Sequence, residues 1–152
     1  MKQMVLLLLL VVVGSLSYGN QFDGAKPKRS WCDTIPVIIP AKFEDDYGIR
    51  YVINDQIWIQ EPSTKYHILR WNKDQQYLIA KNDHQNKSDA GLYTRIDYMR
   101  FSGMAPYTWG FCLSVYKAAT DSIAEFGPNN TDRVNPKKGC NGFPFSRMKL
   151  VQ

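Results

Sequence analysis

Short segments in which apolar and polar residues alternate, separated by turn-forming residues, dominate the chain from residue 48 to residue 116. The clearest pair covers residues 65–71 and 76–81, which flank the four-residue turn 72–75. Alternation with a period of two is typical of a β-strand with one buried face, and two such runs around a short turn are typical of a hairpin. Consecutive hairpins favour an antiparallel meander, so the expected fold class is mainly β.

About seven strands are predicted in this way. They cover residues 36–40 (an edge strand or an extended lead-in), 49–53, 56–60, 65–71, 76–81, 92–99 and 107–116. A meander of this length closes into a barrel or packs as a sandwich, and the sequence leaves both open. Apolar residues at helical spacing, followed by Gly127-Pro128, then predict one short helix near residues 116–126. The tail, residues 129–152, is rich in turn formers and is expected to be irregular.

Residues 1–19 have the pattern of a secretory signal peptide. A lysine near the start precedes nine consecutive apolar residues, 5–13, and small residues surround the expected cleavage site after Gly19, with cleavage after Ser17 as the alternative. The apolar run is far shorter than the ~20 residues that a helix needs to cross a bilayer. We therefore expect a secreted, extracellular protein with no membrane span.

Beyond this leader we expect a flexible basic arm over residues 20–30 and a single secreted β-rich domain over residues 31–152. The net charge of the chain is +5, and basic residues gather in the arm and in the tail. Basic ends on an extracellular protein can attract an anionic matrix polymer, although an ordinary solvated surface explains the same residues. Secretion and the lack of a recognition motif argue against nucleic acid as a partner.

The chain contains three cysteines, Cys32, Cys112 and Cys140. An exported protein meets oxidising conditions, so pairing is expected, and an odd number leaves one cysteine over. We expect the pair Cys112–Cys140, which would tether the tail to the body, with Cys32–Cys140 as the alternative. With the first pairing, Cys32 would be free or would link two chains in a disulfide-linked dimer.

Two N-x-S/T sequons begin at Asn86 and Asn129, both in polar stretches typical of loops. Loops tolerate glycans, so both asparagines are candidate N-glycosylation sites. Chance matches to so short a motif are common, and an unmodified surface loop is the alternative at each position.

The sequence offers no catalytic or metal-binding motif. The two histidines, His67 and His84, have no second histidine or cysteine at metal-ligand spacing, and the chain lacks a Gly-x-Ser-x-Gly motif. We therefore expect no metal, no cofactor and no catalytic residue. A secreted hydrolase remains an alternative, because Glu61 could form a pair with Asp55 or Asp97 in space.

The many aromatic residues on or beside the predicted strands suggest a binding role. On the inner face of a small barrel, such side chains can line an apolar pocket and their hydroxyls can orient a ligand, whereas ordinary core packing is the alternative. The pocket candidates are Trp58, Tyr66, Trp71, Tyr77, Tyr98 and Trp109. The leading hypothesis is a non-catalytic extracellular binding protein that carries a small hydrophobic ligand. A structural or interaction component of an extracellular matrix is the second hypothesis.

The layout of residues 43–145, a strand meander followed by a helix and a disulfide-tethered tail, resembles that of the secreted lipocalin and calycin group. The resemblance implies a calycin-like barrel. Lipocalins open their first strand with Gly-x-Trp, where this chain has Arg29-Ser30-Trp31, so no binding residue is carried over. The segment 135–145 is also similar to the tails of small secreted proteins of invertebrates, including molluscs, in which such chains can enter the shell matrix.

Overall fold

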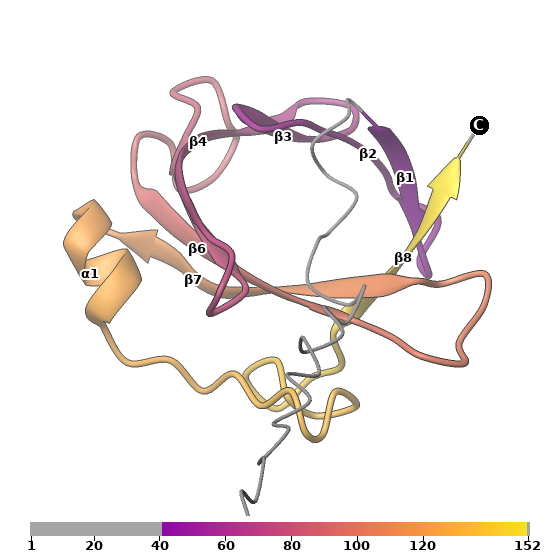
Figure 1. Cartoon of the computed structure of the whole chain (residues 1–152). Coiled ribbons are helices and arrows are strands. Elements are labelled where there is room, and N and C mark those ends of the chain that lie inside the picture. The colour runs from indigo at the N-terminus through magenta and orange to yellow at the C-terminus, as the bar shows by residue number, and fades with distance from the viewer. Residues whose placement is uncertain (1–40, 152) are drawn as a thin grey trace, which may run out of the picture.

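Residues 41–151, which the computed structural model describes, form a closed antiparallel barrel of eight strands (Figure 1). Each strand pairs with the next along the chain, and the last pairs with the first to close the ring. The strands are β1 (Ala41–Asp45), β2 (Arg50–Ile53), β3 (Ile57–Gln60), β4 (Thr64–Asn72), β5 (Tyr77–Asn82), β6 (Tyr93–Arg100), β7 (Trp109–Ala118) and β8 (Ser146–Val151). The predicted mainly β meander is confirmed, and of the two arrangements left open the chain adopts the barrel.

One face of each strand supplies the interior of the barrel. Along β7, Trp109, Phe111 and Leu113 occupy alternate positions; the first two belong to the central apolar cluster, and Leu113 packs against it. The rings of Trp58 and Phe111 meet edge to face with their centroids 4.9 Å apart. Burial of each large apolar side chain contributes about 1.5–3 kcal/mol, so the interior is a major source of stability.

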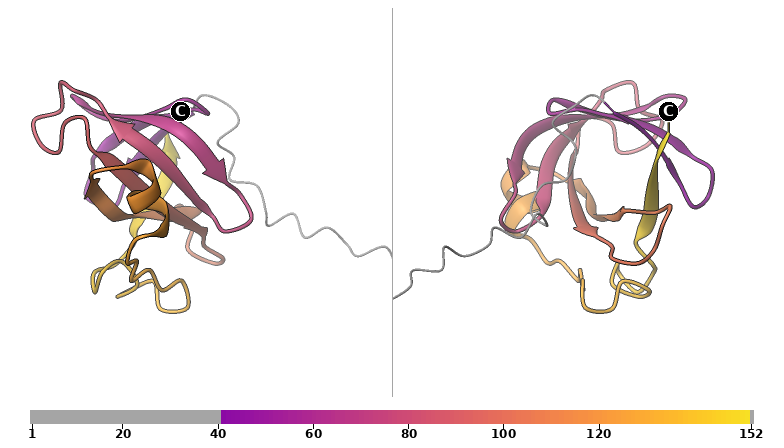
Figure 2. Two further views of the ribbon diagram at one scale, coloured as in Figure 1. Left: turned by 90° about the vertical axis from the view of Figure 1, so that its left-hand side faces the viewer. Right: turned by 45° about the vertical axis from the view of Figure 1, so that its right-hand side comes forward.

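A short helix, α1 (Asp121–Phe126), packs against the outside of β5, β6 and β7 (Figure 2). The hydroxyl of Thr120 accepts a hydrogen bond from the backbone N–H of Ile123 and caps the helix N-terminus. The predicted helix near 116–126 was therefore too long at its start, because β7 continues to Ala118 in its ladder with β6. The apolar cluster between helix and barrel consists of Tyr77, Ile79, Ala118 and Ala124. Within residues 41–151, no helix is long and apolar enough to cross a membrane.

Two of the strands were missed by the sequence prediction. Strand β8 forms in the tail that was expected to be irregular, and β1 was not predicted either. These strands pair with each other, for example through Phe43 and Leu150. Because they lie at opposite ends of the described chain, no local turn between them marks the pairing. Several sequence predictions lie outside the described residues: the leader 1–19, the arm 20–30, the strand 36–40 and Cys32.

The part of the tail that precedes β8, residues 129–145, lies on the outside of the barrel, and we call it the tail segment (Figure 2). The predicted disulfide between Cys112 and Cys140 is confirmed, and it ties this segment to β7. Close to it, the side-chain amide of Asn141 donates to the carbonyl oxygen of Ser114 at 3.2 Å. The tail segment is therefore anchored to the outer face of β7.

Candidate functional site

The six aromatic residues predicted to line a pocket do not share one face of the barrel. Tyr77 is the clearest exception, because it lies outside, under α1, and its hydroxyl donates to Glu125 Oε1 at 2.7 Å. Trp71 packs at the edge of the central cluster, and its indole N–H donates to the carbonyl oxygen of Asp55. The remaining four are buried members of the central cluster: Trp58, Tyr66, Tyr98 and Trp109.

The interior aromatics make close contacts with one another. The ring centroids of Trp58 and Trp109 lie 5.9 Å apart, as do those of Trp71 and Tyr98, and both pairs meet at steep angles. Burial raises the pKa of Tyr98 to about 12, so its hydroxyl stays protonated at any physiological pH. Three of the pockets on the described part of the chain have volumes of about 220–460 Å³, and none of the six predicted aromatics lines any of these three.

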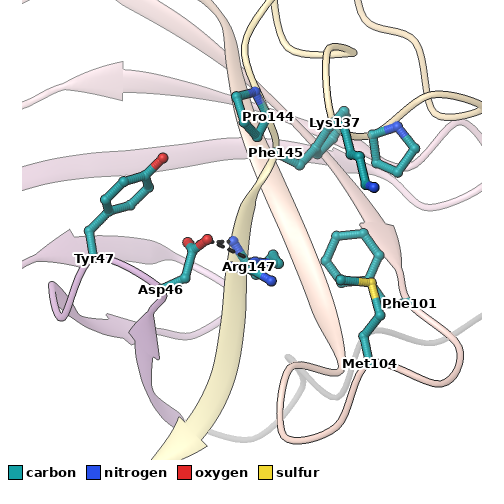
Figure 3. A pocket seen from close by; sticks show the side chains of 9 residues that line it. Asp46, Tyr47, Phe101, Met104, Lys137, Pro144, Phe145 and Arg147 are labelled. Atoms are coloured by element: carbon teal, nitrogen blue, oxygen red, sulfur yellow. Dashed lines mark hydrogen bonds and ion pairs between the residues drawn. The ribbon is translucent and has the colours of Figure 1, made fainter.

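The largest of these three pockets has a volume of about 460 Å³ and lies outside the barrel, against the tail segment (Figure 3). We call it the tail pocket. Four separate parts of the chain meet there: the β1–β2 turn, the β6–β7 loop, the tail segment and the start of β8. Its lining residues are Asp46, Tyr47, Phe101, Met104, Pro136, Lys137, Pro144, Phe145 and Arg147.

The walls of the tail pocket are mainly apolar. Phe145 is fully buried, and Phe101 and Met104 face it from the β6–β7 loop (Figure 3). The ring of Phe101 lies over Gly110, where an added Cβ would come within 2.7 Å of the ring. The same Cβ would lie 2.9 Å from the backbone oxygen of Ser146, so a larger residue at this position of β7 would force the Phe101 ring and β8 to shift.

The charged groups of the tail pocket are two cations and one carboxylate. The Nε of Arg147 donates to Asp46 Oδ2 at 2.8 Å, and this hydrogen bond raises the pKa of the Arg147 guanidinium. The guanidinium carbon also lies 5.0 Å from the centre of the Tyr107 ring, a cation–π contact. Lys137 is exposed and takes part in none of the ion pairs formed by the described residues. The rim therefore carries an excess of positive charge.

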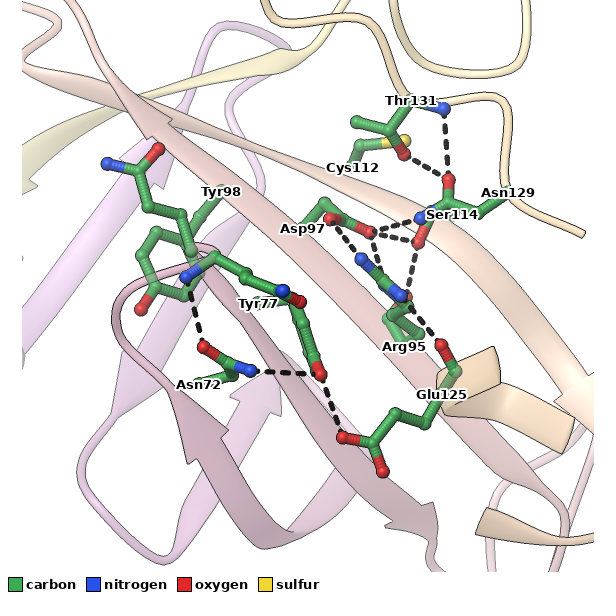
Figure 4. A network of polar contacts seen from close by, with 12 residues as sticks. Asn72, Tyr77, Arg95, Asp97, Tyr98, Cys112, Ser114, Glu125, Asn129 and Thr131 are labelled. Carbon is green, nitrogen blue, oxygen red and sulfur yellow. Dashed lines mark hydrogen bonds and ion pairs between the residues drawn. The ribbon is translucent and has the colours of Figure 1, made fainter. Parts of the chain in front are cut away.

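A buried polar network holds the tail segment in place (Figure 4). Its centre is Asp97 on the outer face of β6, which has no exposed surface. Arg95 donates two hydrogen bonds to its carboxylate, at 2.9 and 3.0 Å, and Arg133 from the tail segment donates a third at 2.7 Å. Ser114 and Asn129 donate to the same carboxylate. Several charge-assisted hydrogen bonds are needed to offset the cost of burying a carboxylate, and here they fix one wall of the tail pocket.

The two sequon asparagines both use their side chains within the fold. Asn86 is 8% exposed, and its amide both accepts from the backbone N–H of Lys65 at 2.9 Å and donates to the Lys65 carbonyl oxygen at 2.8 Å. Asn129 donates from its amide nitrogen to Asp97 and accepts from the backbone N–H of Thr131. The amide nitrogen is the atom that would carry a glycan, so a glycan on Asn86 requires this side chain to leave its place.

Both histidines lie beside the carboxylate of Asp83. His67 Nε2 lies 2.6 Å from Asp83 Oδ2, and this hydrogen bond lowers the pKa of Asp83. His84 is exposed, with its ring 3.6 Å from the other oxygen of Asp83. Residues 41–151 hold no group of three or more side chains arranged to bind a metal ion. Asp97, one of the carboxylates named from the sequence, is engaged in the network that anchors the tail segment.

The residues of the tail pocket were not predicted as a site. In the sequence, apolar residues stand among turn-forming residues on both sides of Pro144, close to Cys140. This pattern indicates that the tail packs against the barrel. Nothing in the sequence brings this segment to the β6–β7 loop and the β1–β2 turn. Comparison of the chain with protein-family models, with curated proteins and with solved structures found no match.

Proposed function

We propose that this protein is an extracellular, non-catalytic binding protein and that its tail pocket takes a small hydrophobic ligand. The observation that carries the proposal is the tail pocket itself, with a volume of about 460 Å³ and walls of aromatic, proline and methionine side chains. Pockets for small molecules usually have volumes of roughly 300–1,000 Å³, mainly apolar walls and a few polar groups. The leader sequence supports the extracellular location.

The anchoring of the tail segment supports the same proposal. The disulfide Cys112–Cys140 and the ion pair between Arg133 and Asp97 hold this segment from two sides. A pocket wall that is already fixed in place costs little conformational entropy when a ligand binds. Because the tail segment is held in place before a ligand arrives, less of the binding free energy is lost in ordering it.

The matrix hypothesis has less support, because three of the five basic residues in the tail are paired with carboxylates. Arg133 is paired with Asp97, and Arg147 is paired with Asp46. Lys149 Nζ lies 2.8 Å from Glu44 Oε1. An anionic polymer would have to compete with these carboxylates for the same cations.

The proposal is tested with N-phenyl-1-naphthylamine, an uncharged probe whose fluorescence rises in apolar surroundings. Titrated into the secreted protein, the probe should bind saturably with a stoichiometry of one. The variant Met104→Trp fills the pocket from its exposed side and should weaken binding at least tenfold. The matched control is Leu150→Trp, which adds the same ring at an exposed apolar position of β8 away from the pocket. Non-saturable binding, or equal affinity in the two variants, would refute the proposal.

A further inference from the structure

Two buried N–H groups of the described chain have no hydrogen-bond acceptor: the Nε of Arg100 and the Nε1 of Trp109. These residues lie directly opposite each other, at the end of the ladder between β6 and β7. A buried donor without an acceptor costs about 1–3 kcal/mol, and more when the group is charged. Such groups are rare in native proteins, and two adjacent ones call for a missing partner.

Both side chains belong to the inner face of the barrel. Residues 96, 98 and 100 occupy alternate positions on β6, and Ile96 and Tyr98 are buried in the central cluster. Trp109 is 1% exposed, and its ring centroid lies 5.2 Å from that of Phe43. The register pair therefore places the Arg100 side chain beside the Trp109 indole, at one end of the interior.

This pair is separate from the tail pocket. The tail pocket lies on the outer side of the sheet, and neither Arg100 nor Trp109 lines it. Arg100 also takes part in none of the ion pairs that the described residues form. A guanidinium that is partly buried beside aromatic rings, with its Nε–H unpaired, favours a negatively charged acceptor over a neutral one.

We propose that Arg100 and Trp109 form an oxyanion-binding site at this end of the barrel and that it takes the carboxylate of a small organic acid. A carboxylate oxygen can accept from the guanidinium Nε–H and the indole N–H together. Arginine suits this ligand because its planar group matches a carboxylate and keeps its charge at all physiological pH values. The aromatic side chains next to Trp109 suit the apolar body of such an acid.

The experiment follows the indole N–H and arginine Nε–H signals of the ¹⁵N-labelled secreted protein by NMR. Sodium acetate and sodium octanoate are titrated in separate arms at constant ionic strength, with sodium chloride and octanol as reference arms. The Trp109 and Arg100 signals should shift together and saturate with the acids, and neither reference should move them. Saturation with acetate identifies a site for a small oxyanion, and saturation with octanoate alone identifies a site for an acid with an apolar body; both outcomes support the proposal.

Variants assign the response to the two donors. Arg100→Gln should weaken binding of the acid about tenfold or more, since hydrogen bonds to charged groups are lost. The matched control is Lys73→Gln, which removes one positive charge from the exposed β4–β5 turn, and it should leave the affinity unchanged. Trp109→Phe identifies the indole signal and keeps an aromatic ring in the core. The proposal is overturned when neither acid shifts these signals, or when Arg100→Gln and Lys73→Gln respond alike. Met104→Trp should not alter the shifts, which separates this site from the tail pocket.

Discussion

Arg133 and Asp97 form an ion pair that joins the tail segment to the barrel wall, with Arg133 Nη2 lying 2.7 Å from Asp97 Oδ1. The carboxylate has no exposed surface, whereas the guanidinium is partly exposed. The same guanidinium group donates to the backbone carbonyl oxygens of Tyr98 and Gln76. One arginine therefore links the tail segment to β6 and to the turn that precedes β5.

Replacement of this arginine should destabilise the protein. Arg133→Ala removes the shorter of the two charged hydrogen bonds to Asp97 Oδ1, so the buried carboxylate keeps only Arg95 as a charged donor. We expect the free energy of unfolding to fall by about 2–3 kcal/mol, as measured by urea denaturation. Lys138→Ala, at an exposed position of the same segment, should change it by no more than about 0.5 kcal/mol. Similar losses in the two variants would show that the ion pair does not stabilise the fold.

Removal of the disulfide should loosen the tail segment and weaken probe binding in the tail pocket. The two cysteines are separated by 28 residues in the sequence, and closing a loop of this size stabilises a protein by about 3–4 kcal/mol in the chain-entropy treatment. The double variant Cys112→Ala/Cys140→Ala should lose stability by that order and bind N-phenyl-1-naphthylamine more weakly. Unchanged affinity in this variant would mean that the tether does not shape the pocket.

The attachment of α1 should weaken in acid. A hydrogen bond from Arg70 and a second from Tyr77 lower the pKa of Glu125, and Arg70 likewise lowers the pKa of Asp121. Carboxyl groups with a lowered pKa in the folded state stabilise it above their ordinary pKa, and this contribution disappears as the pH falls through the folded-state value. The free energy of unfolding should therefore decline below about pH 4.5, and Glu125→Gln should flatten that decline.

The control for this pH dependence is Glu61→Gln, at an exposed position outside the ion pairs of the described residues. It should leave the profile between pH 3 and pH 7 unchanged. A profile that is equally steep in the wild type and in Glu125→Gln would contradict the role assigned to the contact between Arg70 and Glu125.

The sequon at Asn86 can be separated from the structural role of its side chain. Asn86→Ala removes both hydrogen bonds to the Lys65 backbone and should cost about 1–3 kcal/mol in unfolding free energy. Ser88→Ala destroys the same sequon without touching those bonds and should be nearly neutral. Mass spectrometry of the secreted variants shows whether Asn86 carries a glycan, and equal losses of stability would disprove the structural role.

Features with local causes could be predicted from the sequence, whereas features assembled from distant segments could not. The hairpin of residues 65–71 and 76–81 was predicted because alternation and a turn lie side by side, and it matches β4 and β5. The same alternation defines two faces of β5 but does not show which face a helix will cover. Tyr77 was therefore expected in the interior, although it lies under α1.

The tail pocket shows the same limit. Its lining residues come from both ends of the described chain and from the β6–β7 loop, so neither spacing nor composition could bring them together. The disulfide was predicted because the expected secretory leader implies oxidation and because few pairings of three cysteines are possible. The sequence did not predict that the side chains of Arg100 and Trp109 lie next to each other, because this depends on the register between β6 and β7.

Closure of the barrel by β8 has a consequence for how the nascent protein is protected from aggregation. Until the last strand has emerged, β1 and β7 each expose a row of backbone groups that could pair with another chain. When β8 inserts between them, the described sheet keeps no open edge. A chain that stopped before Ser146 would retain both edges, so the final residues act as a safeguard against edge-to-edge association.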